Sequence, residues 1–124
     1  MDKELETEDF SNELAGRLFN FAADVIKFLG TLANVPESKI IKYQLAKSSG
    51  SSGANYEEAQ AGSSKADFTN KVRISLREMR ESNYWLRLIK ASGLTCNYEE
   101  RDRLINESRE LKNILGSIVH KTRN

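Results

Sequence analysis

Apolar residues recur every three or four positions through most of the chain, which is the spacing of one helix face. The first series steps by 4, 4, 3, 4, 3 and 4 residues: Phe10, Leu14, Leu18, Phe21, Val25, Phe28 and Leu32. A second series lies beside it: Phe19, Ala22, Ile26 and Leu29. The pattern predicts a helix over about 10–33, after an acidic, frayed segment 1–9, and its two apolar faces call for two covering neighbours.

A break follows at residues 34–36. Because proline is tolerated in the first helical turn, a second helix is predicted from Pro36 to Gly62, which has the character of a C′ glycine. Within it, propensity alone favours a flexible loop over the Ser/Gly-rich residues 47–54. The alternative is helix, because small residues repeat every four positions: Ala46, Gly50 and Ala54, then Ser49 and Gly53. That spacing lets two helix backbones approach, at about 1 kcal/mol per glycine.

The third predicted helix, 65–92, has the most regular pattern. Its inward positions step by 4, 3, 4, 3, 4 and 3: Phe68, Val72, Ser75, Met79, Ser82, Leu86 and Ile89. This is a heptad seam. Ser64 with Asp67 at N3 has the form of an N-terminal cap, and Gly93 ends the helix.

The fourth predicted helix, 98–121, repeats the same rhythm after a cap at Thr95 or Asn97. Its inward positions step by 4, 3, 4 and 3: Leu104, Ser108, Leu111, Leu115 and Ile118. No alternating strand pattern competes. Short connections favour antiparallel neighbours, so the chain is predicted to be one all-α domain, an up-down-up-down four-helix bundle.

Several linked blocks run through the second and third helices: Gln44-Leu45, Ser48, Ser51, Gly53-Ala54-Asn55-Tyr56-Glu57-Glu58-Ala59, Ser64-Lys65-Ala66-Asp67-Phe68 and Glu81-Ser82-Asn83-Tyr84-Trp85-Leu86. Over residues 44–89 this pattern resembles the bacterial four-helix-bundle family encoded in intervening sequences of 23S ribosomal RNA genes. Its relatives include the accessory variability determinant proteins of diversity-generating retroelements.

The resemblance implies a four-helix protomer that assembles into a homopentameric ring, and it implies that residues 47–54 are helical. Some members are similar to adaptors that bind nucleic acid or a reverse transcriptase, and for most members no activity is established. Family members usually carry a branched aliphatic residue where this chain has Ser52. A more polar contact of the second helix is therefore expected.

The composition excludes several classes of protein. The 124 residues carry a net charge of +1 and a single proline, which excludes a histone-like polycation and argues against strong non-specific DNA affinity. Cys96, the only cysteine, cannot form an intramolecular disulfide, so a reducing cytoplasm is expected. No stretch has the length and apolarity of a membrane span, and the acidic start is unlike a signal peptide.

The sequence contains few residues suited to catalysis. Cys96 and the single histidine, His120, have no further support as a nucleophile pair. No metal-ligand cluster and no Glu-x-x-His pair appears, and residues 50–53 lack the lysine of a phosphate-binding loop. The expectation is a protein that is not an enzyme and holds no metal or cofactor.

The near-neutral charge conceals two opposed segments. Residues 1–35 hold three basic and seven acidic side chains, whereas residues 65–95 hold seven basic and three acidic ones. Basic residues and an aromatic share one face of the third helix: Arg73, Arg77, Arg80, Tyr84 and Arg87. Such a face suits a phosphate backbone and a stacked base. The alternative is a solvated face, or one that meets the acidic first helix of a neighbour. Glu81 is expected to pair with Arg77 at i+4.

Two further groups of residues stand out. Polar side chains gather along the second helix: Gln44, Ser48, Ser51, Asn55 and Glu58. They are expected to form a buried network that sets helix register or a protomer interface, or alternatively a ligand site.

An apolar strip with a tryptophan lies off the seam: Ile74, Trp85 and Leu88. It is typical of a subunit interface, and the alternative is a place in the protomer's own core.

These observations predict a non-enzymatic, oligomeric binding or adaptor protein, most consistent with a pentamer. Its partner would be RNA, DNA or a nucleic-acid-processing protein. The alternative function is a purely structural protein–protein scaffold that binds no nucleic acid.

Overall fold

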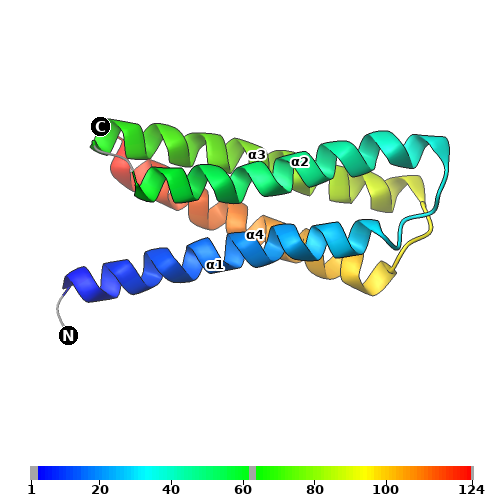
Figure 1. Cartoon of the computed structure of the whole chain (residues 1–124), viewed down its shortest axis with the longest axis horizontal. Helices are drawn as coiled ribbons and strands as arrows, with labels where there is room; N and C mark the ends of the chain where they lie inside the picture. The colour runs from blue at the N-terminus through cyan, green and yellow to red at the C-terminus, as the bar shows by residue number, and fades with distance from the viewer. Residues whose placement is uncertain (1–2, 62–63, 124) are drawn as a thin grey trace.

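The computed structural model describes residues 3–61 and 64–123, with side chains from Phe10 onward, and shows four helices and no strand among them. They are α1 (Lys3–Leu29), α2 (Pro36–Gln60), α3 (Lys65–Ser92) and α4 (Tyr98–Thr122), lying lengthwise beside one another (Figure 1). None of these helices is long and apolar enough to cross a membrane.

The first helix differs from its predicted bounds at both ends. It already begins at Lys3, because no proline or glycine interrupts its first three turns. It ends at Leu29, where three backbone N–H groups, those of Gly30, Thr31 and Leu32, bond three residues back and tighten the turn. Leu32 is still buried outside the helix, whereas Phe10, the first residue of the series, is 51% exposed.

The Ser/Gly segment 47–54 is helical throughout, so the loop favoured by propensity is wrong and the helix implied by the resemblance is confirmed. Ser48, Ser49 and Ser52 are buried. The hydroxyl of Ser49 donates to the carbonyl of Ala46, 3.2 Å away, so even a helix-weakening residue has its polar group satisfied. Helix α2 is followed by Ala61 as its C-cap, and the predicted role of Gly62 lies outside the described residues.

Helix ends follow the predicted capping pattern closely. The Ser64 hydroxyl accepts from the N–H of Asp67, and the Asn97 side chain accepts from the N–H of Glu100. Asn97 rather than Thr95 is therefore the cap of α4, while the N–H of Ala33 donates to the carbonyl of Thr95 and ties the two loops at that end together. Gly93 has φ +72°, the left-handed conformation that ends a helix at glycine.

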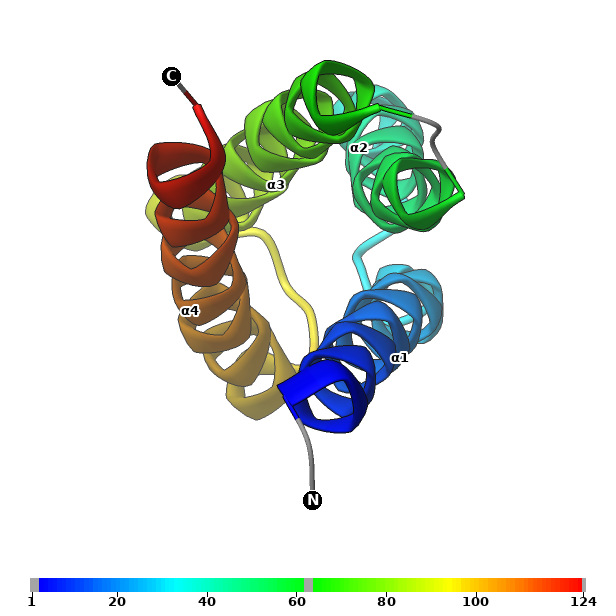
Figure 2. The same cartoon turned by 90° about the vertical axis from the view of Figure 1, so that its left-hand side faces the viewer.

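The helices, seen end-on in Figure 2, enclose one apolar core that the buried side chains form. Contact is most extensive between α2 and α3 and least extensive between α1 and α4. Hydrogen bonds across the helix pairs join early residues of one helix to late residues of the next, as Thr69 of α3 and Thr122 of α4 do at 3.0 Å. The predicted seams supply most of the buried side chains, including Leu18, Met79 and Leu111.

Candidate nucleic-acid interface

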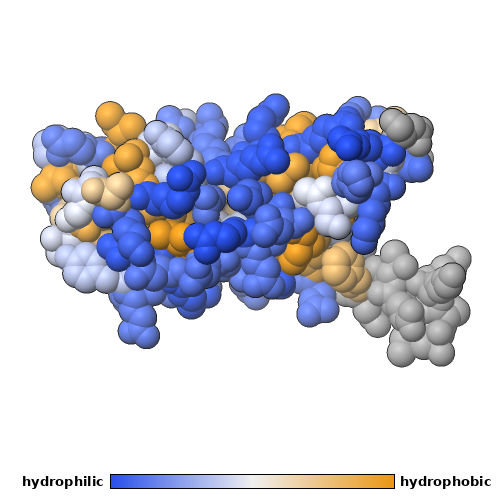
Figure 3. Space-filling view, turned by 180° about the vertical axis from the view of Figure 1, so that it is seen from behind, coloured by the Kyte–Doolittle hydropathy of each residue, from blue (hydrophilic) through white to orange (hydrophobic). Residues whose placement is uncertain are grey.

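Five residues form the outer face of α3, here called the arginine face: Arg73, Arg77, Arg80, Tyr84 and Arg87. All five are exposed, and Tyr84 keeps 50% of its surface in solvent. The heptad seam on the opposite side of α3 is buried, which turns this face outward. Figure 3 shows the back of the molecule, where α3 and α4 lie, and most of that surface is hydrophilic.

One end of the arginine face is held in place by neighbouring side chains. The Nε of Arg87 donates to Oδ1 of Asn83 at 2.8 Å, and Nδ2 of Asn83 donates to Oγ of Ser108 on α4 at 2.9 Å. The Arg87 guanidinium lies 5.9 Å from the centre of the Tyr84 ring, which meets the Trp85 ring edge-on at 5.3 Å. A cation and an aromatic ring are thus positioned side by side before any partner binds.

The predicted pair between Arg77 and Glu81 does not form. Oε2 of Glu81 instead accepts a hydrogen bond from Nε1 of Trp85, at 3.1 Å. A half-buried indole N–H requires an acceptor, and an arginine that precedes its glutamate by four residues is the weaker order of such a pair. Within residues 3–61 and 64–123, neither the Arg77 nor the Arg80 side chain forms a hydrogen bond or an ion pair.

Arginines on α1 and α4 differ from those of α3 in their partners. Their ion pairs include Arg17–Glu107 at 2.7 Å, Arg101–Asp102 at 3.0 Å and Arg103–Asp24 at 2.8 Å. The hydrogen bond to Glu107 raises the pKa of the Arg17 guanidinium. Among the described residues, no ion pair involves an arginine of the arginine face. Several acidic side chains of α1 and α4 are therefore paired inside the protomer, and Lys71 and Lys90 of α3 are paired as well. Arg109 of α4 is an exception, since it donates to Oδ1 of Asn106.

The predicted polar group on α2 is divided between four places. Ser48 is buried, and its Oγ lies 2.8 Å from Oγ of Ser82 on α3. Asn55 donates to the carbonyl and hydroxyl of Ser51 within α2 itself. Glu58 is exposed and pairs with Lys71 at 2.9 Å, and Gln44, half-buried, is not joined to the others. The structure does not gather these residues into one pocket.

The more polar contact expected at Ser52 lies between α2 and α3, and its partner is Ser75. Oγ of Ser52 donates to the carbonyl of Ser75 at 2.8 Å, and Oγ of Ser75 donates to the carbonyl of Ser52 at 2.7 Å. These reciprocal bonds to main-chain carbonyls require the two backbones to lie close. The signal for the contact was the placement of Ser75 and Ser82 at seam positions, where larger apolar residues are the rule.

The glycines of α2 do not produce that close approach. A Cβ atom added at Gly50 would meet nothing within 4 Å, and one at Gly53 would lie 3.5 Å from Cβ of Leu18 on α1, an ordinary contact. The expected close approach of helices is therefore absent at Gly50. At Gly53 the backbone of Leu18 lies 3.6 Å from the added Cβ, so α1 and α2 do approach each other there. At the α2–α3 contact, serines have that role instead.

The strip of Ile74, Trp85 and Leu88 is half-buried in the protomer. Trp85 packs against the apolar core from outside, so part of its surface is already covered. Its assignment to a subunit interface stays a prediction.

An apolar groove of about 370 Å³ lies between α1 and α2. Its α1 wall includes Phe19 and Ile26, which are 67% and 62% exposed, and its α2 wall includes Gly50 and Gly53. The second apolar face of α1 was expected to be covered by a neighbouring helix. The chain buries Leu29 of that face but leaves Phe19 and Ile26 open, because α2 presents glycines there and no large side chain.

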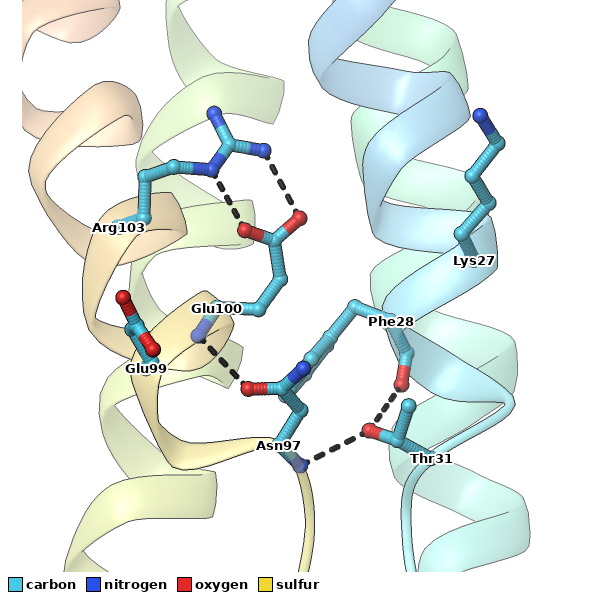
Figure 4. Close-up of a pocket in the computed structure, with 7 residues that line it drawn as sticks. All are labelled: Lys27, Phe28, Thr31, Asn97, Glu99, Glu100 and Arg103. Carbon is cyan, nitrogen blue, oxygen red and sulfur yellow. Dashed lines mark hydrogen bonds and ion pairs between the residues drawn. The ribbon is translucent and has the colours of Figure 1, made fainter.

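A polar cavity of about 440 Å³ opens where α1 ends and α4 begins (Figure 4). Four of the polar residues that line it bond to one another or to the backbone: Thr31, Asn97, Glu100 and Arg103. Arg103 donates to both carboxylate oxygens of Glu100, at 2.5 and 2.9 Å, and this lowers the pKa of Glu100. The N–H of Asn97 donates to Oγ1 of Thr31, which donates to the carbonyl of Phe28. The arrangement closes this end of the bundle.

The residues considered for catalysis lie apart. Cys96 precedes α4 and His120 lies near its other end, about 33 Å away at 1.5 Å per helical residue. Burial raises the pKa of the Cys96 thiol, the opposite of what a nucleophilic cysteine needs. In the described part of the chain, no three histidine, cysteine or carboxylate side chains are placed to hold a metal ion.

Comparison with known proteins identifies the family. The sequence profile of the 23S rRNA-intervening sequence proteins matches residues 12–117. The chain belongs to this family. A crystal structure of a protein of unknown function from the S23 ribosomal protein family of Bacteroides thetaiotaomicron is similar to it, with 32% identity and a TM-score of 0.74. The match covers 86% of this chain and 97% of that one. No curated protein matches the chain.

Membership of the 23S rRNA-intervening sequence family confirms the resemblance found in residues 44–89 and extends it over most of the chain. The family name refers to ribosomal RNA genes, and the related structure is itself described as having unknown function. A biochemical role for this member must therefore be argued from its own surface.

Proposed function

We propose that this protein is a non-enzymatic, cytoplasmic adaptor that binds nucleic acid through the arginine face of α3. The single observation that supports the proposal is the contrast between its arginines. Arg17, Arg101 and Arg103 hold carboxylates, whereas Arg73, Arg77, Arg80 and Arg87 are exposed with no carboxylate partner among the described residues. Phosphate oxygens are the natural acceptors for such groups.

The shape of the arginine face favours a single strand. Arg73 and Arg87 are 14 residues apart, which is about 21 Å along a helix, and a straight row of cations can follow a flexible backbone. Tyr84 stands among them with half of its surface exposed, so an unpaired base can stack on its ring. A nucleic-acid-processing protein with an acidic surface is the competing partner.

The test compares a variant with reversed charges on the arginine face with a control variant that has the same number of reversed charges at other exposed positions. Arg73→Glu, Arg80→Glu and Arg87→Glu are combined in one variant. Its control combines Lys39→Glu, Lys47→Glu and Arg109→Glu, which are exposed and lie off the face. Binding of fluorescent single-stranded RNA and DNA is measured over a range of salt concentrations.

The face variant should lose at least tenfold in affinity, and the slope of log K against log salt should decrease by about 2, since each phosphate contact on a single strand contributes about 0.7. The control should retain most of its affinity. Equal affinity of the wild-type chain and the face variant would refute the proposal and favour the structural-scaffold alternative.

We further propose that neighbouring helices run antiparallel within each protomer and that the protomers assemble as a homopentamer. A second copy of the chain then covers the groove between α1 and α2. Phe19 and Ile26 support this, because two large apolar side chains more than 60% exposed along one groove are typical of a contact surface. A ring would present five arginine faces, and multivalency would strengthen weak contacts.

Light scattering on a sizing column tests the assembly. Phe19→Glu combined with Ile26→Glu should give a monomer, while Ile40→Glu, at an equally exposed apolar position of α2, should leave the mass unchanged. A wild-type monomer would refute the assembly. If only Trp85→Ala dissociates the oligomer, the interface lies instead at Ile74, Trp85 and Leu88.

A further inference from the structure

We propose that a basic cavity between the first turns of α3 and the last turn of α4 binds a phosphate group of the nucleic acid. This inference rests on the proposed function and adds an anchoring site at one end of the arginine face. The cavity has a volume of about 190 Å³, well above the roughly 30 Å³ that one water molecule occupies in the liquid. A phosphate group therefore fits.

Two threonines form a rigid floor for this cavity. Thr69 of α3 is 4% exposed, and its Oγ1 donates to Oγ1 of Thr122 on α4 at 3.0 Å. Oγ1 of Thr122 in turn donates to the carbonyl of Ile118 at 2.9 Å. This chain of bonds fastens the two helix ends to each other, so groups around the cavity keep their positions without a ligand.

Three cations surround the floor: Lys65, Arg73 and Arg123. Nη1 of Arg73 donates to Oδ1 of Asn70 at 3.2 Å, and Nη2 of Arg123 lies 3.2 Å from Nδ1 of His120. Asn70 is a neutral acceptor that orients the Arg73 guanidinium without neutralising it, and His120 brings no negative charge to Arg123. Of the described residues that line the cavity, none is acidic.

The backbone dipoles at the end of α4 also affect the charge of the cavity. The carboxyl end of α4 brings negative backbone dipoles toward the cavity. His120 and Lys121 lie in that last turn, and Arg123 follows it, so basic side chains offset the dipole. The cavity therefore keeps an excess of positive charge, which suits a phosphate better than a singly charged carboxylate.

Arg73 links the cavity to nucleic acid in particular. It lines the cavity and is also the first residue of the arginine face. A strand with one phosphate in the cavity can continue past Arg77 and Arg80 toward Tyr84 without changing direction. The phosphate can belong to the strand's 5′ end or to its backbone, and the two sources are distinguished below.

The test uses cavity residues that lie outside the arginine face. Lys65→Ala and Arg123→Ala remove cavity cations, while Lys121→Ala and Arg109→Ala remove the same charges from exposed positions that do not line it. Inorganic phosphate is titrated into the full chain and followed by the NMR shifts of residues 65–70 and of the Arg73 side chain. Oligonucleotides with and without a 5′-phosphate are titrated in parallel.

Phosphate should shift these signals in the wild-type chain and in both controls, and the shifts should be lost in Lys65→Ala and Arg123→Ala. Oligonucleotide affinity should fall about three- to tenfold in the cavity variants and less than twofold in the controls. A loss seen only with 5′-phosphorylated strands assigns the cavity to the strand end, and an equal loss with both assigns it to the backbone.

Separate outcomes apply to the cavity and to the arginine face. If the face variant loses oligonucleotide binding while Lys65→Ala and Arg123→Ala bind like wild type, the cavity proposal is overturned and the proposed function stands. If phosphate shifts the cavity signals but no oligonucleotide binds, the cavity is a phosphate site and the proposed function fails. An acidic peptide that competes with phosphate for the same signals more strongly than nucleic acid does would overturn the assignment to nucleic acid.

Discussion

Ser52 lies fully buried where α2 meets α3, at the position where the family resemblance leads one to expect a branched aliphatic residue. We predict that Ser52→Val destabilises the protein by about 1–3 kcal/mol. The hydroxyl donates to the carbonyl of Ser75 at 2.8 Å and lies 3.2 Å from its Oγ. Loss of this hydrogen bond costs about 1 kcal/mol.

Valine also adds apolar volume at a contact that two main-chain carbonyls already approach closely. Overpacking of this kind costs about 1–3 kcal/mol, and burial of the added carbon returns about 1 kcal/mol. Ser52→Ala loses the same hydrogen bond without overpacking and gains roughly 0.5 kcal/mol of helix propensity. The expected order of stability is therefore wild type, then alanine, then valine.

Urea unfolding followed by circular dichroism measures this order, at one fixed protein concentration because assembly would affect the midpoint. The midpoints should fall while the m-values stay constant, and thermal midpoints should fall by about 3–5 °C per kcal/mol. A Ser52→Val protein as stable as wild type would refute the reasoning. It would mean that α2 and α3 can separate at little cost and that the reciprocal serine bonds do not determine their spacing.

Three further predictions concern a glycine inside α2, the glycine that ends α3, and an ion pair at the start of α4. Gly50→Ala should stabilise the protein by about 1 kcal/mol in the same urea assay, because a Cβ there meets nothing within 4 Å; a lower midpoint would contradict this. Gly93→Ala should destabilise by about 1 kcal/mol, since φ is +72°, and an unchanged midpoint would contradict the left-handed cap. The hydrogen bond from Arg103 lowers the pKa of Glu100, so its stabilisation is present at neutral pH and lost as the pH falls below the group's ordinary value. Glu100→Gln should flatten the pH dependence of unfolding in that acidic range, and an unchanged profile would contradict the role of this pair.

Sequence pattern by itself determined the four helices and most of their bounds. The seam of α3 shows why: every third or fourth residue must leave water, and only a helix places Val72, Met79 and Leu86 on one side. The helix caps were equally local, since the Ser64 hydroxyl accepts a hydrogen bond from the N–H of Asp67, only three residues further along the chain. Outward placement of the arginine face followed directly from the inward placement of the seam.

Partners across helices were decided only by the tertiary structure. Propensity favoured a loop at residues 47–54, yet contact with α3 makes this segment helical, because packing outweighs a cost of about 1 kcal/mol per glycine. Likewise, sequence spacing paired Arg77 with Glu81, but the fold brings Glu81 to the indole of Trp85.

The candidate phosphate cavity depended on the fold in the same way. Thr69 and Thr122 are 53 residues apart in the chain, and only the packing of α3 on α4 brings their hydroxyls to 3.0 Å and places Lys65, Arg73 and Arg123 around them. Local periodicity specifies which side of a helix is buried. It carries no information on which residue of the next helix lies opposite, because that depends on how complete side chains fit together.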